Sequence, residues 1–202
     1  MTLLQAESAT VICLRALALA EHDGNFTSLE DATPIAREAR LRYDIRRRTV
    51  LEALDWRFAR RRVAGQGVNA EVCPAGYEKA WQRPLECIRI RGVWDGACLI
   101  PHVIEEVIFT ADLAAVQIVY TGDVFDAARF PPVFTTALEL LLAADFAMKY
   151  ARSINRHDSF LQDFRRCMEE ADSIEAGELS QTDAFAPGPW VDAIRSRSFG
   201  GY

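Results

Sequence analysis

The chain has 202 residues, a formal net charge of −6 at neutral pH, and apolar side chains at half of its positions. This length and apolar content suffice for one domain with a sizeable core, and they exclude a chain that is disordered throughout. Its five cysteines include no Cys-x-x-Cys pair, which favours reduced thiols over a disulfide framework.

The first residues predict a helix over 2–20, because Leu14 and Leu17 recur near the helical period. Glu7 and Arg15 interrupt the apolar run, and no basic leader precedes it. We therefore expect neither a signal peptide nor a membrane span in this region.

An arginine-rich helix is predicted over 34–58. Asp31 or Thr33 caps its first turn, and its apolar residues recur three, four or seven positions apart. Ten arginines and four acidic residues lie within 37–62, so this segment carries +6 and the remainder of the chain carries −12. The arginines expected to point away from the apolar stripe are Arg37, Arg40, Arg47 and Arg48.

The periodicity changes to two between residues 85 and 120, which predicts a small antiparallel sheet inserted into a helical protein. Asp95-Gly96 is typical of a hairpin turn. A second hairpin is predicted to pair 103–110 with 115–120. The preceding stretch, residues 63–80, indicates no function.

Two further helices are predicted, over 132–151 and 158–176. Pro131-Pro132 begins the first of them, and its leucines occupy more than one face, so it should be central. The second helix ends at Gly177 after an acidic run. The acidic residues of this run are Glu169, Glu170, Asp172, Glu175 and Glu178.

The last segment, residues 180–202, contains Pro187-Gly188-Pro189 and Gly200-Gly201, which disfavour regular structure. It is either disordered or an extended arm that becomes ordered on a partner, since large aromatic side chains bury much area on docking. Those aromatic residues are Phe185, Trp190, Phe199 and Tyr202. The expected fold is thus α+β and mainly α, with a helical bundle and inserted sheet over 1–179 and an extended C-terminal arm over 180–202.

Residues suited to catalysis or metal binding are scattered along the chain. Cys98 and His102 have the spacing of half a zinc site, but no second close pair accompanies them. Glu105-Glu106 lies in a predicted strand, where neighbouring side chains point to opposite faces. We therefore expect no enzyme activity, no catalytic residue, no metal and no cofactor. The cysteines expected to be buried as small apolar residues are Cys87 and Cys98.

The arginine-rich segment has three interpretations. It could be a solvated helix face with intramolecular ion pairs, which contribute little when exposed. It could bind nucleic acid, although the chain is acidic and has no helix-turn-helix or zinc-finger pattern. It could be a protein interface, in which arginines pair with the carboxylates of the acidic run, and we favour this interpretation. The residues assigned to the interface are Arg40, Arg46, Arg47, Arg48, Glu169, Glu170, Asp172 and Glu175.

Three groups of motifs follow one another between residues 10 and 190. The first comprises Asn25-Phe26-Thr27-Ser28-Leu29-Glu30-Asp31-Ala32, then Ala39, Tyr43, Arg47, Leu51 and Trp56-Arg57-Phe58-Ala59. The second is Pro84-Leu85-Glu86-Cys87-Ile88-Arg89, and the third comprises Ile118-Val119-Tyr120, Phe125 and Phe130-Pro131-Pro132-Val133-Phe134. In this order the motifs resemble the tail tubular protein A family, the head-to-tail adaptors of short-tailed bacteriophages. The loop 65–76 has no counterpart among them.

The resemblance implies a structural function in the virion. It implies a homo-oligomeric ring, a dodecamer, that assembles in the host cytoplasm between the portal protein and the tail nozzle protein, with DNA passing through its lumen without sequence-specific binding. It also implies that the arm contacts the portal through Phe185, Trp190, Phe199 and Tyr202. The alternative is an arginine-rich nucleic-acid-binding module in packaging or in another phage assembly role. No membrane is involved in either case.

Overall fold

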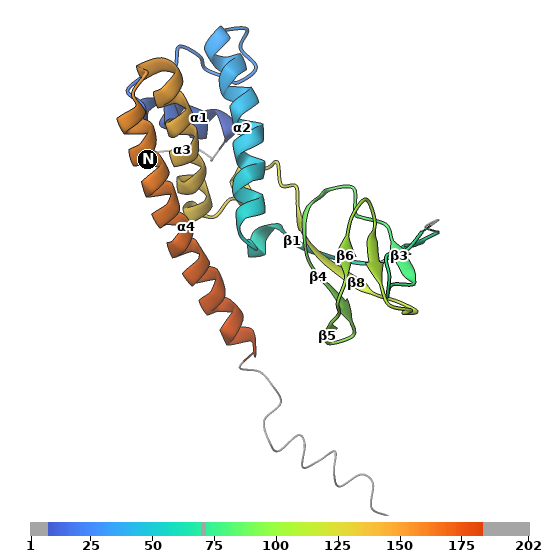
Figure 1. The fold of residues 1–202 in the computed structure, drawn as a ribbon. Helices are drawn as coiled ribbons and strands as arrows, with labels where there is room; N and C mark the ends of the chain where they lie inside the picture. The colour runs from blue at the N-terminus through green and yellow to red at the C-terminus, as the bar shows by residue number, and fades with distance from the viewer. Residues whose placement is uncertain (1–7, 70–71, 184–202) are drawn as a thin grey trace, which may run out of the picture.

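The computed structural model describes residues 8–69 and 72–183. Its helices form one part of the molecule, and two four-stranded antiparallel sheets form a second part beside the lower end of α2 (Figure 1). The predicted fold class, mixed α+β and mainly α, is confirmed for these residues.

The helical part is organised around α3, which packs against α1, α2 and α4. The helices are α1 (Ala9–Leu19), α2 (Pro34–Ala53), α3 (Pro132–Phe146), which continues as a π-helical turn (Ala147–Ala151), and α4 (Ile154–Asp183). Thr33 caps α2, because the backbone N–H of Ala36 donates to its hydroxyl at 3.2 Å, and Pro34 suits the first turn. The predicted central position of α3 is confirmed, since residues on several of its faces are buried.

An aromatic cluster lies at the end of the helical core, where the chain passes from α2 into the sheets. Trp56 and Phe58 follow α2, and both lie 5.1 Å from the ring of Phe134 in α3. Phe130 lies 4.6 Å from the same ring. Trp56 and Phe134 are fully buried. The segments that enter and leave the sheets are therefore held together by packing at this point.

The strands form two sheets where one was predicted. Their bounds are β1 (Arg60–Ala64), β2 (Gly67–Val68), β3 (Lys79–Trp81), β4 (Cys87–Asp95), β5 (Cys98–Leu99), β6 (Val103–Ile104), β7 (Ile108–Thr110) and β8 (Gln117–Gly122). One sheet has the order β1-β8-β4-β5 and the other β2-β3-β7-β6. The β part therefore begins at residue 60, and parts of β1, β2 and β3 lie within the stretch 63–80, whose sequence indicates no function.

The turn at Asp95-Gly96 is confirmed, because Asp95 pairs with Cys98 across it and Gly96 has φ +56. The second predicted hairpin is wrong. The β7 strand pairs with β3 and β6, whereas β8 pairs with β1 and β4 in the other sheet. The periodicity missed β1, because Arg60, Arg61 and Arg62 show no alternation of apolar and polar residues.

Two helix ends differ from the prediction. The α2 helix ends at Ala53 instead of residue 58, because Leu54 is already extended. The α4 helix continues through Gly177 to Asp183, so the first residues of the predicted arm are helical. One glycine costs a helix only about 1 kcal/mol relative to alanine, too little to end it without a second signal. Phe185, Trp190, Phe199 and Tyr202 lie outside the described residues, as do residues 1–7 of the predicted first helix.

No helix in the described ranges 8–69 and 72–183 is both long enough and apolar enough to cross a bilayer.

Candidate functional site: the arginine network

The arginines of residues 37–62 are largely engaged in ion pairs within the chain. In the part of the chain that the structure describes, at least seven of the ten lie within 4.0 Å of a carboxylate. These seven are Arg40, Arg42, Arg46, Arg47, Arg48, Arg60 and Arg61. The charge of this segment is therefore mostly neutralised within the chain, both by acidic residues near in sequence and by the distant Asp123, Asp145 and Glu86.

Arg47 is the deepest of these groups, with only 1% of its side chain exposed. It donates to Asp123, which is itself buried, and to the carbonyl oxygen of Val124 at 2.8 Å. Its guanidinium lies 4.4 Å from the ring centre of Phe125. The prediction that Arg47 points away from the apolar stripe is wrong. Its position four residues after Tyr43 and four before Leu51 was the signal that places it on the buried face.

Arg46 joins α2 to α3 through a two-pronged contact with Asp145. Its Nε and Nη2 donate to the two carboxylate oxygens at 2.7 and 2.6 Å, and these hydrogen bonds raise the pKa of Arg46. Arg42 approaches the same carboxylate at 3.3 Å. Arg46, which the sequence analysis assigned to a subunit interface, is thus held by its own chain.

Glu38 extends this network to the π-helical turn. It accepts from Lys149 at 2.7 Å and from Arg42 at 2.6 Å. The hydrogen bond from Lys149 is the largest cause of a lowered pKa at Glu38, and the hydrogen bond from Arg42 adds to it.

Replacement of Glu38 by glutamine is expected to make the free energy of unfolding depend less on pH in the acidic range. Because the pKa of Glu38 is lowered by folding, the unfolded chain binds more protons in this range. The stabilisation that Glu38 contributes is therefore complete above the usual pKa of glutamate in the unfolded chain. It is lost as the pH falls through the lowered pKa of Glu38 in the folded chain. Urea unfolding at a series of pH values measures the slope. The double variant Glu38→Gln with Lys149→Met should lose no more unfolding free energy than Glu38→Gln alone. If the losses from the two single substitutions add up in the double variant, Glu38 and Lys149 do not interact.

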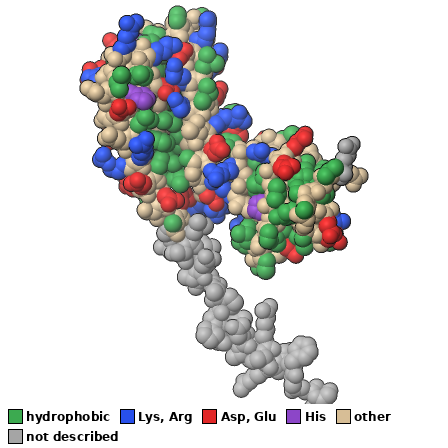
Figure 2. Space-filling model, in the orientation of Figure 1, with side chains coloured by type: hydrophobic (Ala, Val, Ile, Leu, Met, Phe, Trp, Pro, Cys, Tyr) green, Lys and Arg blue, Asp and Glu red, His purple; other side chains and the backbone are tan. Residues whose placement is uncertain are grey.

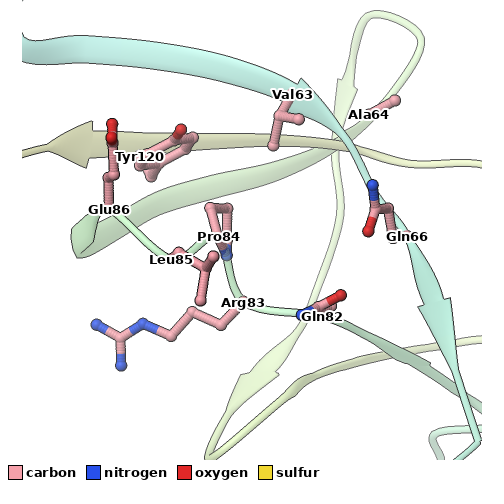
Figure 3. Close-up of a pocket in the computed structure, with 9 residues that line it drawn as sticks. All are labelled: Val63, Ala64, Gln66, Gln82, Arg83, Pro84, Leu85, Glu86 and Tyr120. Carbon is pink, nitrogen blue, oxygen red and sulfur yellow. The ribbon is translucent and has the colours of Figure 1, made fainter.

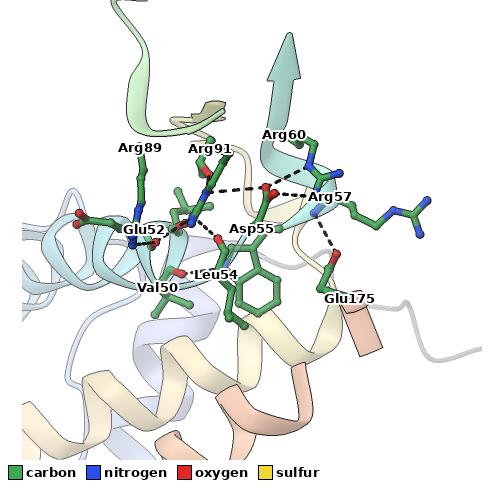
Figure 4. A network of polar contacts seen from close by, with 12 residues as sticks. Val50, Glu52, Leu54, Asp55, Arg57, Arg60, Arg89, Arg91 and Glu175 are labelled. Atoms are coloured by element: carbon green, nitrogen blue, oxygen red, sulfur yellow. Dashed lines mark hydrogen bonds and ion pairs between the residues drawn. The ribbon is translucent and has the colours of Figure 1, made fainter. Parts of the chain in front are cut away.

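A second cluster of arginines joins the end of α2 to the sheets (Figure 4). Arg91, on β4, donates to the carbonyl oxygens of Leu51 and Glu52 at 3.2 and 2.9 Å and to that of Leu54. Burial lowers the pKa of Arg91. These carbonyls carry the negative end of the helix dipole, so a guanidinium there satisfies and stabilises them. This contact explains why α2 ends at Ala53.

Asp55 lies between the two arginines of this cluster that approach from the sheet. Arg60 donates to both of its oxygens, at 3.1 and 2.6 Å, and Arg91 lies 3.8 Å away. Arg91 also donates to the hydroxyl of Thr121 at 2.7 Å. No local pattern in the sequence marks Asp55 or Arg91 as members of this cluster.

The acidic run lies on the outer surface of α4. Glu169, Glu170 and Asp172 are exposed, as predicted for an interface. Glu175 is half-buried and accepts from the backbone N–H of Arg57 at 3.2 Å, so it contributes to the contact between α4 and the end of the arginine segment. Figure 2 shows acidic and basic side chains interspersed over the helical part on the face drawn.

Five of the ten arginines are exposed, namely Arg37, Arg40, Arg48, Arg57 and Arg62. Arg40 pairs with Glu30 at 2.8 Å near the surface, and Arg48 binds Asp123 at 3.1 Å with 63% of its side chain exposed. Arg37 and Arg62 are exposed and have no carboxylate partner among the residues whose placement is described. Of the predicted interface arginines, Arg40 and Arg48 are therefore accessible, whereas Arg47 is not.

A cavity of about 360 Å³ lies between β1 and the loop 82–86 (Figure 3). Its charged groups are engaged within the chain, since Arg83 donates to the carbonyl oxygens of Cys87 and Ile88 and Glu86 pairs with Arg61. Glu105 and Glu106 line a neighbouring cavity. They lie in the bend between β6 and β7, so the prediction that they belong to a strand is wrong.

All five cysteines are free thiols. Cys98 is exposed and Cys87 is half-buried, so the expectation of burial is wrong for Cys98. Burial raises the pKa of Cys13 to about 12, which makes it a packing residue. In the described part of the chain, no three side chains of His, Cys, Asp or Glu gather in a way that could hold a metal ion.

No protein-family model matches this chain, and no curated protein is found to match it.

Proposed function

We propose that this chain is a structural head-to-tail adaptor of a phage or phage-like particle, a virion protein that forms a ring between portal and tail nozzle. The proposed ring is homo-oligomeric, DNA passes through its lumen, and the subunit performs no catalysis. The segment 180–202 is the proposed contact with the portal protein.

The observation that supports this proposal is the convergence of the three motif groups that resemble the adaptor family. Arg47 of the first group contacts Phe125 of the third, and Trp56 and Phe58 pack on Phe134. Ile88 of the second group packs against the same helical core. The three motif groups therefore pack together in one core. This is expected if the resemblance to the adaptor family reflects a shared fold.

The arginine network weighs against the alternative of a nucleic-acid-binding module. Direct phosphate binding needs guanidinium groups that are free to neutralise phosphates. At least seven of the ten arginines already have carboxylate partners in the described part of the chain. Arg46 and Arg47 in particular are used to hold α2 against its own chain.

The test is to mix the full-length chain with candidate portal proteins and to measure the mass of the complex. We expect a fixed number of copies on each portal ring. Trp190→Ala should weaken portal binding by about 1–3 kcal/mol, the usual effect of removing an aromatic anchor. A chain that binds no portal candidate would contradict the adaptor function. Retention of DNA in a gel shift that weakens steeply with salt would support the nucleic-acid alternative instead.

A further inference from the structure

The outward face of α2 carries an apolar stripe that its own chain leaves exposed. Leu41 and Ile45 lie one turn apart, with 58% and 62% of their surface exposed. Arg37 lies one turn before Leu41, and Arg48 lies one turn after Ile45, and both are exposed. We call these four residues the α2 stripe.

Apart from Arg48, which also binds Asp123 at 3.1 Å, the stripe is separate from the contacts that hold α2 in place. Glu38, Arg42 and Arg46 lie on the flank of α2 that binds Asp145 and Lys149. Single exposed apolar residues are common on protein surfaces, but two large ones stacked between arginines form a continuous contact surface. Such a surface suits a partner that is apolar in the middle and acidic beside it.

A surface of that kind lies on α4. Ile174 is 47% exposed, and Glu170 precedes it by one helical turn on the same side of the helix. One turn further back, Arg166 pairs with Asp163 at 3.2 Å, so these two charges neutralise each other. We call Glu170 and Ile174 the α4 patch. Glu169 and Asp172 beside it add negative charge that favours an arginine-bearing partner.

The two surfaces belong to helices on opposite sides of the helical part. Figure 1 shows α3 between α2 and α4, and both pack against it. One chain therefore does not bring its stripe onto its own patch. Two different surfaces on opposite sides of identical subunits are what a head-to-tail contact requires, and such a contact closes into a ring when its rotation allows.

We propose that the α2 stripe of one copy binds the α4 patch of the next copy. This inference rests on the proposed ring function and assigns the surfaces of the subunit contact. Leu41 and Ile45 pack against Ile174, while Arg37, one turn from Leu41, faces Glu170, one turn from Ile174. A contact between two α2 stripes is disfavoured, because it would place arginines against arginines. Nucleic acid is a poorer occupant, because phosphates gain nothing from the two apolar side chains.

The test uses disulfide cross-linking of the portal-bound assembly. Ile45→Cys and Ile174→Cys are introduced together in a Cys98→Ser background, which removes the exposed native thiol. Oxidation should then link successive copies into a ladder of covalent multimers. Each single cysteine variant should give no ladder, and a mixture of the two single variants should give linked pairs.

The controls separate this inference from the proposed function. Ile45→Glu should lower the apparent affinity for the portal by at least about tenfold, because neighbouring copies no longer support one another. Leu19→Glu, which alters an exposed apolar residue on α1, should leave the affinity unchanged, and both variants should keep the native melting temperature. Assembly on the portal without a ladder would overturn the α2–α4 contact alone. Pairs formed by Ile45→Cys alone would overturn it in favour of an α2–α2 contact. No assembly at all would overturn both this contact and the adaptor function.

Discussion

Replacement of Asp123 by alanine is expected to lower the free energy of unfolding by about 3–5 kcal/mol, the usual cost of leaving one partner of a buried ion pair alone. Asp123 is 6% exposed and binds Arg47, which is 1% exposed. Without the carboxylate, the buried guanidinium keeps only the carbonyl oxygen of Val124, the ring of Phe125 and the exposed Asp44 at 3.9 Å, so its charge is poorly compensated. Equilibrium urea unfolding followed by circular dichroism measures the loss.

Two variants determine whether burial is the cause. Arg48→Ala removes the other partner of Asp123, but this side chain is 63% exposed, so the loss should stay below about 1 kcal/mol. Asp123→Leu combined with Arg47→Met removes both buried charges together and should be less damaging than Asp123→Ala. Equal losses in Asp123→Ala and Arg48→Ala would show that the buried pair has no special role.

Replacement of Phe134 by alanine is expected to cost about 3–5 kcal/mol of unfolding free energy, as is usual for a buried phenylalanine. Phe134 is fully buried, and its ring meets those of Trp56, Phe58 and Phe130 at 4.6–5.1 Å. The substitution therefore leaves a cavity bordered by large rings that cannot close it fully. Thermal and urea unfolding measure the change, with loss of near-ultraviolet dichroism from Trp56 as a local signal.

Phe125→Ala is the matched control for this substitution. Its ring is 68% exposed and lies over Arg47, a contact worth about 0.5–1 kcal/mol at an exposed site. We expect a loss of that size. A loss from Phe134→Ala no larger than the loss from Phe125→Ala would contradict the aromatic cluster as the anchor between helices and sheets.

Three local signals in this sequence predicted the local structure correctly, whereas Gly177 did not end its helix. Thr33 and Pro34 marked the start of α2, Pro131-Pro132 marked the start of α3, and Asp95-Gly96 marked a hairpin. Each depends on backbone preferences within a few residues, which act in the same way whatever the rest of the chain does. The apolar character of α3 likewise indicated its central position, because a helix that is apolar on several faces must be covered on several sides.

The sheet arrangement was not predictable in this way. The β2 and β3 strands are two and three residues long, so they show no periodicity, and β1 consists mainly of arginines. The pairing of β8 with β1 and β4 brings together residues from 60 to 122. Strand pairing between distant segments depends on how the whole β part packs, which short windows of sequence do not report.

The same distinction between local signals and long-range packing applies to the charged residues of the candidate site. The sequence by itself determined that arginines are concentrated in one segment of the chain and acidic residues in another, because composition is a local property. Only the tertiary structure decided which charges remain available. Arg47 is buried because Asp123, 76 residues away, comes to neutralise it, and Arg46 is held by Asp145. The energy of a charge depends on its solvation and on its partners, and both are set by the packing of distant segments.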